Sequence, residues 1–96
     1  MKELAKYPKR SEDTASRIID DEAVIVMPDK GLVRVLNEVG SRIWQVLDGK
    51  HTVEDIINII SSEFEVTQEI AREDTLDFIK ELEEKNMLVL NDEQAL

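Results

Sequence analysis

Few residues in this sequence have types and spacings that could support catalysis. His51 is the only histidine, there is no cysteine, and the three glycines (Gly31, Gly40 and Gly49) are isolated from one another. A metal centre on His51 would need a second histidine or a carboxylate at helical spacing, and a phosphate loop would need clustered glycines. We therefore interpret His51 as an ordinary loop residue and expect no metal, nucleotide or other cofactor.

Carboxylates are numerous enough that a catalytic pair has to be considered. They fall mainly in the first turns and on the solvent faces of the expected helices, at Glu54, Asp55, Glu69, Glu73, Asp77 and Glu81. Such positions are typical of a solvated surface. The serines have no candidate base other than His51. The sequence therefore predicts a protein that is not an enzyme.

The charge of the chain limits its partners. The 96 residues carry a formal net charge of −10, although four basic residues against Glu3 make the first ten residues positive. An acidic body repels phosphate backbones and anionic lipids, so neither nucleic acid nor membrane is an expected partner. No segment has the pattern of a signal peptide or a membrane span, and the expected location is cytoplasmic.

Three short segments have strand patterns. Residues 14–19 form the weakest, residues 23–27 are a nearly continuous apolar run, and residues 32–36 alternate between two faces. The turn-prone Asp20-Asp21 pair and the Pro28-Asp29-Lys30-Gly31 stretch separate them. Because these connections are short, we expect an antiparallel meander.

Three helical patterns follow. Asn37 is a good N-cap for the first helix, and Gly49 is expected to end that helix as its C′ residue. Thr52 begins a sequence that resembles a capping box, and Thr67 caps the third helix. Asn86 is a plausible left-handed terminator, and the apolar residues after it could add a final strand. The single Trp44 lies off the centre of its helical stripe, and we expect it to close the core.

The predicted fold is α+β: a three-stranded antiparallel meander packed on three helices in the order βββααα. Residues 14–90 would form the domain, residues 1–13 a flexible arm and residues 91–96 a disordered tail. Three helices followed by a short strand also suggest a winged helix-turn-helix with residues 70–85 as recognition helix. That segment carries six acidic and three basic side chains, so the alternative of a DNA-binding or regulatory winged helix lacks electrostatic support.

One stretch also resembles a known family. Residues 31–56 contain Leu36-Asn37, Gly40-Ser41, Ile43-Trp44, Leu47-Asp48-Gly49 and Thr52-Val53-Glu54-Asp55-Ile56. This string is similar to that of the PqqD-like family, also called RiPP recognition elements, and the likeness extends from about Arg17 to Leu90. Where the family usually has glycine near the end of the third helix, this chain has Asn86.

The resemblance implies a winged-helix-like domain that binds the leader segment of a ribosomally made precursor peptide. The domain would present that peptide to a modifying enzyme, often a radical-SAM protein, without being an enzyme itself. A DNA-binding regulator and an inert structural remnant stay open as alternatives.

Simple physics indicates where a peptide could bind. The outer edge of residues 32–36 would be unpaired, so an extended peptide could add there as a fourth strand. The third helix would wall the groove with a flank that lies off the core face centred on Ala71, Phe78 and Leu82. The expected peptide-binding residues are Leu32, Val33, Arg34, Val35, Leu36, Arg72, Leu76, Ile79 and Glu83. Peripheral core packing is the alternative for Leu76 and Ile79, and edge pairing with a second copy leaves a homodimer open.

Overall fold

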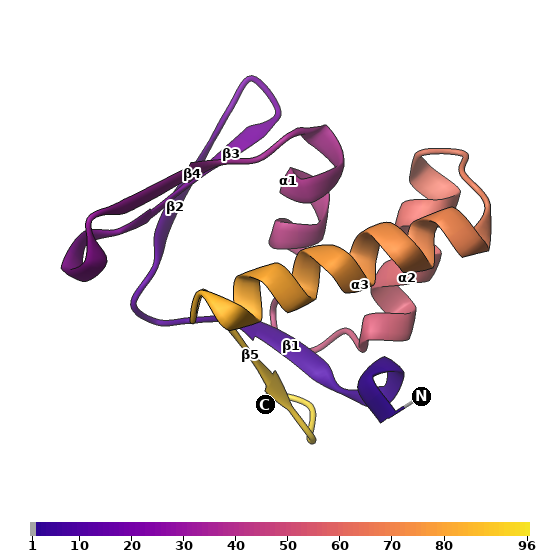
Figure 1. Ribbon diagram of the computed structural model, residues 1–96. Helices are drawn as coiled ribbons and strands as arrows, with labels where there is room; N and C mark the ends of the chain where they lie inside the picture. Colours follow the sequence, from indigo (N-terminus) through magenta and orange to yellow (C-terminus); the bar gives the residue numbers. More distant parts are fainter. Residues whose placement is uncertain (1) are drawn as a thin grey trace.

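The computed structural model describes residues 2–96 and contains two small sheets and three α-helices (Figure 1). The elements in chain order are the 3-10 helix η1 (Lys2–Ala5), β1 (Tyr7–Arg10), β2 (Ala15–Ile19), β3 (Glu22–Met27), the 3-10 helix η2 (Pro28–Lys30), β4 (Leu32–Val35), α1 (Glu38–Gln45), α2 (Val53–Glu63), α3 (Gln68–Glu84) and β5 (Leu88–Asn91). None of these helices is both long enough and apolar enough to span a bilayer.

The larger sheet has the order β2-β3-β4 with antiparallel pairing throughout. Asp20 and Asp21 both adopt positive φ, which suits the tight hairpin turn between β2 and β3. Gly31 ends η2 in the left-handed region and donates its N–H to the carbonyl of Pro28 at 3.2 Å. The predicted meander packed on three helices is thus confirmed.

The N-terminal segment differs from the expected loose arm. Tyr7–Arg10 forms β1, which pairs antiparallel with β5. Pro8 is buried, and its carbonyl accepts the N–H of Gly49 at 3.0 Å. β1 has no hydrophobic periodicity that could have predicted it. It forms a strand because its backbone pairs with a segment about 80 residues away in the chain.

The C-terminal segment is also tied to the body of the protein. Asn91 belongs to β5, and the N–H of Ala95 donates to the carbonyl of Gly49 at 2.8 Å. The expectation that Gly49 ends the first helix is wrong. α1 ends earlier, at Gln45, and Gly49 adopts its positive φ in the loop that follows. A Cβ at Gly49 would lie 3.1 Å from the side chain of Ala95.

The predicted N-caps of the three helices are confirmed. Asn37 Oδ1 accepts the N–H of Gly40, and Thr67 Oγ1 accepts the N–H of Ile70. Thr52 and Asp55 form a reciprocal capping box at the start of α2. These short-range signals fix where each helix begins.

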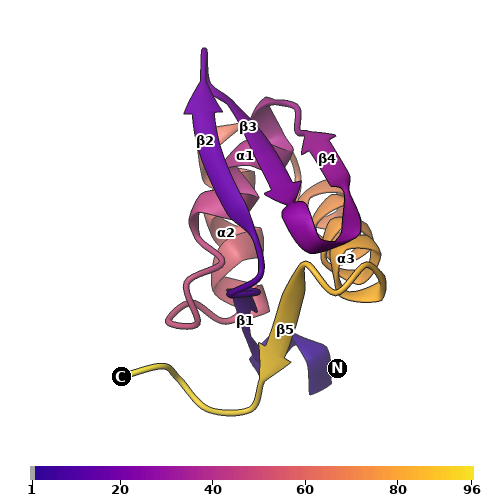
Figure 2. The same ribbon diagram turned by 90° about the vertical axis from the view of Figure 1, so that its left-hand side faces the viewer.

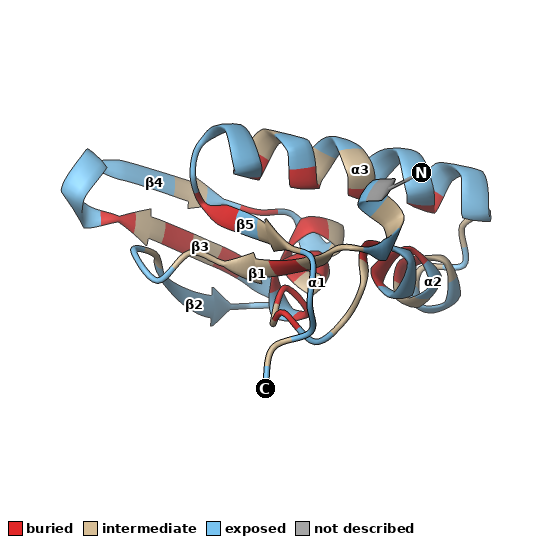
Figure 3. Ribbon diagram, turned by 90° about the horizontal axis from the view of Figure 1, so that it is seen from below, coloured by how far each residue is buried: buried red, intermediate tan, exposed pale blue. Residues whose placement is uncertain are grey.

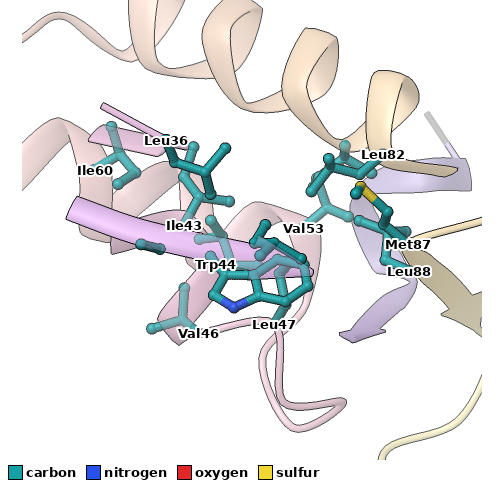
Figure 4. Packing of buried hydrophobic residues seen from close by; sticks show 14 of the residues in the cluster. Leu36, Ile43, Trp44, Val46, Leu47, Val53, Ile60, Leu82, Met87 and Leu88 are labelled. Carbon is teal, nitrogen blue, oxygen red and sulfur yellow. The ribbon is translucent and has the colours of Figure 1, made fainter. Parts of the chain in front are cut away.

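The apolar core lies between the larger sheet and the helices, and continues to β5 (Figure 4). Trp44 is 2% exposed, as expected, and its Nε1 donates to Ser16 Oγ at 3.0 Å. Two residues expected at the peptide site, Leu36 and Ile79, are buried members of this core. The buried stripe of α3 is turned toward Ile79, so Phe78 is only half-buried on the other flank.

One buried hydroxyl joins the sheet to α1. Ser41 Oγ accepts the N–H of Ala23 at 2.6 Å and donates to the carbonyl of Leu36 at 3.3 Å. Leu36 lies opposite Ala23 in continuation of the β3–β4 register and donates its own N–H to the Ala23 carbonyl at 2.9 Å. The Ser41 hydroxyl thus lies between β3 and the end of β4, at the last pair of their hydrogen-bonded ladder. It connects both strands to α1.

Replacing Ser41 by alanine should destabilise the protein. The Ala23 N–H would lose its acceptor in a buried position, which is expected to lower the free energy of unfolding by about 1–3 kcal/mol. Urea denaturation of Ser41→Ala measures the change. Ser62→Ala, at an exposed position of α2, is the matched control and should stay within about 0.5 kcal/mol of the parent. Equal stabilities for the two variants would show that the hydrogen bonds of the Ser41 hydroxyl do not stabilise the fold.

Candidate peptide-binding edge

β4 leaves one edge of the larger sheet open. It pairs with β3 on one side only, and no strand within residues 2–96 pairs with its other side. The bond from the Leu36 N–H to β3 determines the direction of its neighbours, because alternate N–H groups of a strand point to the same side. Arg34 therefore bonds toward β3, whereas the N–H and C=O groups of Val33 and Val35 point to the open edge.

α3 runs alongside this open edge. Figures 2 and 3 show β4 as the strand of the larger sheet nearest to α3, and most of the β4 ribbon is coloured as exposed in Figure 3. Arg34 reaches across to form an ion pair with Glu81. This contact identifies the flank of α3 that faces β4.

Three further residues share that flank of α3, at the helical spacing that places them near Glu81: Asp74, Asp77 and Phe78. They line a cavity of about 300 Å³ together with residues at the start of α1. The other residues of its lining are Asn37, Val39, Gly40 and Ile43. The cavity, which has apolar and carboxylate walls, therefore lies near the end of the open edge at which Val35 is found.

The structure divides the residues expected at the peptide site. Leu32, Val33, Arg34 and Val35 lie on the edge strand, with Val33 and Val35 exposed by 67% and 61%. The register confirms that Arg34 shares the helix side of the sheet with Ile25, whereas Val33 and Val35 present their side chains on the outer face.

The expected α3 residues do not join this edge. Leu76, Ile79 and Glu83 line a different cavity, of about 360 Å³, together with Glu3, Val53, Lys80 and Leu90 from η1, α2, α3 and β5. Arg72 is exposed on α3. The physical reason is the rotation of the helix: with Ile79 in the core, the flank predicted to face the peptide turns toward η1 and β5.

The residues of α3 that the structure places beside β4 are Asp74, Asp77, Phe78 and Glu81, and none of them was expected at the site from the sequence. Their spacing at positions i, i+3, i+4 and i+7 marks one flank of a helix. It does not reveal which flank lies beside β4, because that depends on how the helix packs in three dimensions.

His51 has a local role in the loop before α2. Its Nδ1 lies 3.0 Å from Asp48 Oδ2, and Asp48 Oδ1 accepts the backbone N–H of Lys50 at 2.8 Å. Partial burial raises the pKa of Asp48, but the hydrogen bonds from His51 and Lys50 outweigh it and hold that pKa below its ordinary value. Within residues 2–96, no three histidine, aspartate or glutamate side chains gather closely enough to hold a metal ion.

Comparison with solved structures shows the same fold elsewhere. The structure titled "TbiB1 in Complex with the TbiA(beta) Leader Peptide" matches with a TM-score of 0.77 and 35% sequence identity, covering 83% of this chain and 93% of that one. The structure titled "Lasso peptide synthetase B1 complexed with the leader peptide" also matches with a TM-score of 0.77. It is 23% identical and covers 86% of this chain and 98% of that one, and this second likeness concerns the fold alone.

Comparison at the level of sequence identifies the family. A protein of Gluconobacter oxydans (strain 621H) named "PqqA binding protein" is 33% identical over 70 residues, which are 73% of this chain and 71% of that protein. The family model described as Coenzyme PQQ synthesis protein D (PqqD) matches residues 22–88, from the start of β3 to the first residue of β5. The chain therefore belongs to the PqqD family.

Proposed function

We propose that this chain binds the leader segment of a ribosomally made precursor peptide and presents it to a modifying enzyme. The observation that carries the proposal is the open edge of β4 beside α3. Val33 and Val35 offer two N–H and two C=O groups there, and an extended peptide can pair with them as a fourth strand. The relatives support this role, since one is named for binding PqqA and the solved structure that is 35% identical to this chain is a complex with a leader peptide.

The geometry gives the peptide two different surroundings. Side chains of an added strand would alternate between the outer face of the sheet and the groove walled by α3. The backbone bonds would supply affinity that depends little on sequence, whereas the groove would discriminate among side chains. The side chains on the outer face would remain accessible to the enzyme that modifies the peptide, for which a radical-SAM protein is one candidate class.

We infer that the chain acts by binding and not by catalysis. The groove between β4 and α3, with the cavity at its end, holds carboxylates, Arg34 and apolar side chains. Among the described residues it contains neither a nucleophile paired with a base nor a set of metal ligands. A DNA-binding role is disfavoured by the surface of α3, which carries seven acidic and two basic side chains over Gln68–Glu84.

Proline substitutions can test strand addition because they remove one backbone donor each. Val35→Pro should weaken peptide binding at least tenfold, since its N–H points to the open edge, while lowering stability by only about 1 kcal/mol. Arg34→Pro is the matched contrast: its N–H bonds to β3, so it should unfold or strongly destabilise the domain. The probes are the TbiA(β) leader, PqqA, and synthetic 15-residue peptides enriched from a randomised display library.

Fluorescence anisotropy with these peptides measures the affinity, and urea denaturation measures the stability. Val33→Pro should behave like Val35→Pro. If both variants bind the enriched peptides as tightly as the parent does, the peptide does not pair with β4. If the library yields no peptide that binds the parent chain, the proposed function itself fails.

A second variant separates the two flanks of α3. Leu76→Asp places a charge in the cavity beside η1 and β5, on the flank that faces away from β4. Binding of the enriched peptides should change less than twofold, although the half-buried leucine makes some loss of stability expected. A loss of affinity of tenfold or more, with the fold intact by circular dichroism, would instead place the peptide on the Leu76 flank.

A further inference from the structure

The cavity at the end of β4 has room for an apolar side chain. Val39, Ile43 and Phe78 supply apolar walls, and the cavity volume of about 300 Å³ is in the range of small ligand pockets. Gly40 keeps this arrangement possible, because a Cβ there would lie 3.2 Å from Phe78 Cε1. A side chain at this position would therefore press on the Phe78 ring, which forms one wall.

The rim of the same cavity is negatively charged. Asp74 and Asp77 line it from α3, and both are exposed. Among the side chains of residues 3–96, no ion pair involves either of them, whereas the neighbouring Glu81 is engaged by Arg34. The two carboxylates thus offer acceptors for a cation without breaking an existing contact.

We propose that the peptides bound by this chain carry an apolar anchor for this cavity and a lysine or arginine within two residues of it. This inference rests on the proposed function and specifies the chemistry of its peptide. In an added strand, side chains two residues apart lie about 7 Å apart on the same face, and long basic side chains can span the distance from the cavity to its rim. The cation pairs with Asp74 and Asp77.

Charge complementarity also disfavours competing occupants. An acidic peptide would bring its carboxylates against this rim and against a chain of net charge −10. A second copy of the chain carries the same net charge, so self-association over this cavity meets the same repulsion. An apolar-basic peptide is the occupant that satisfies both the walls and the rim.

The experiment compares two variants of the protein, each with two carboxylates replaced by amides, for their binding to matched peptides. The double variant Asp74→Asn, Asp77→Asn removes both rim charges without changing side-chain size. The double variant Glu69→Gln, Glu73→Gln removes the same number of charges from exposed positions of α3 outside the cavity lining. Each protein is titrated with a synthetic 15-residue peptide enriched on the parent chain, and with versions of that peptide in which its basic residue is replaced by glutamine.

The rim variant should bind the basic peptide about five- to tenfold more weakly than the control variant does, with a shallower dependence on salt. It should not discriminate against the glutamine peptide. Replacing the apolar anchor of the peptide by alanine should weaken binding to all proteins. If the peptides bind but the rim and control variants respond alike, or if enriched peptides lack the apolar-basic pair, this inference is wrong while peptide binding stands. If no peptide binds the parent chain, both proposals fall.

Discussion

The Ser41 hydroxyl is the contact on which the geometry of the edge strand depends. It occupies the end of the β3–β4 ladder, between the Ala23 N–H and the Leu36 carbonyl, and it belongs to α1. Because side chains and backbone groups of a strand alternate with period two, a slip of one residue would reverse the direction of every group in β4. Together with the β3–β4 pairing and the bond from the Leu36 N–H to Ala23, this hydroxyl holds the register that directs the donors of Val33 and Val35 to the open side and Arg34 toward α3.

The acidic character of α3 then has a consequence for the choice of partner. In a winged-helix arrangement this helix would be the one to enter a DNA groove, and its seven carboxylates oppose that. Three of these carboxylates, Asp74, Asp77 and Glu81, lie on the flank of α3 beside the unpaired strand edge, where a peptide with basic side chains meets favourable charge. The charge of this surface therefore favours a peptide over nucleic acid as the partner at the proposed site.

Much of the fold could be predicted from local signals. Strand-like apolar segments and the turn residues between them located the three strands of the larger sheet, and Asn37, Thr52 and Thr67 located the helix starts. The β1–β5 pairing could not be predicted in this way, because polar Tyr7–Arg10 is a strand only through contact with the far end of the chain. For the candidate site, the open edge of β4 followed from its position in the meander, whereas the flank of α3 that lies beside it depended on whether Ile79 or Phe78 entered the core.

Amide hydrogen exchange at single residues of β4 tests strand addition most directly. In the free protein, the amides of Arg34 and Leu36 should exchange slowly, whereas those of Val33 and Val35 should exchange fast. Saturation with an enriched peptide should slow exchange at Val33 and Val35 by tenfold or more, because each N–H gains a backbone acceptor. Bound peptide that leaves both amides exchanging at their free rates would contradict strand addition to β4.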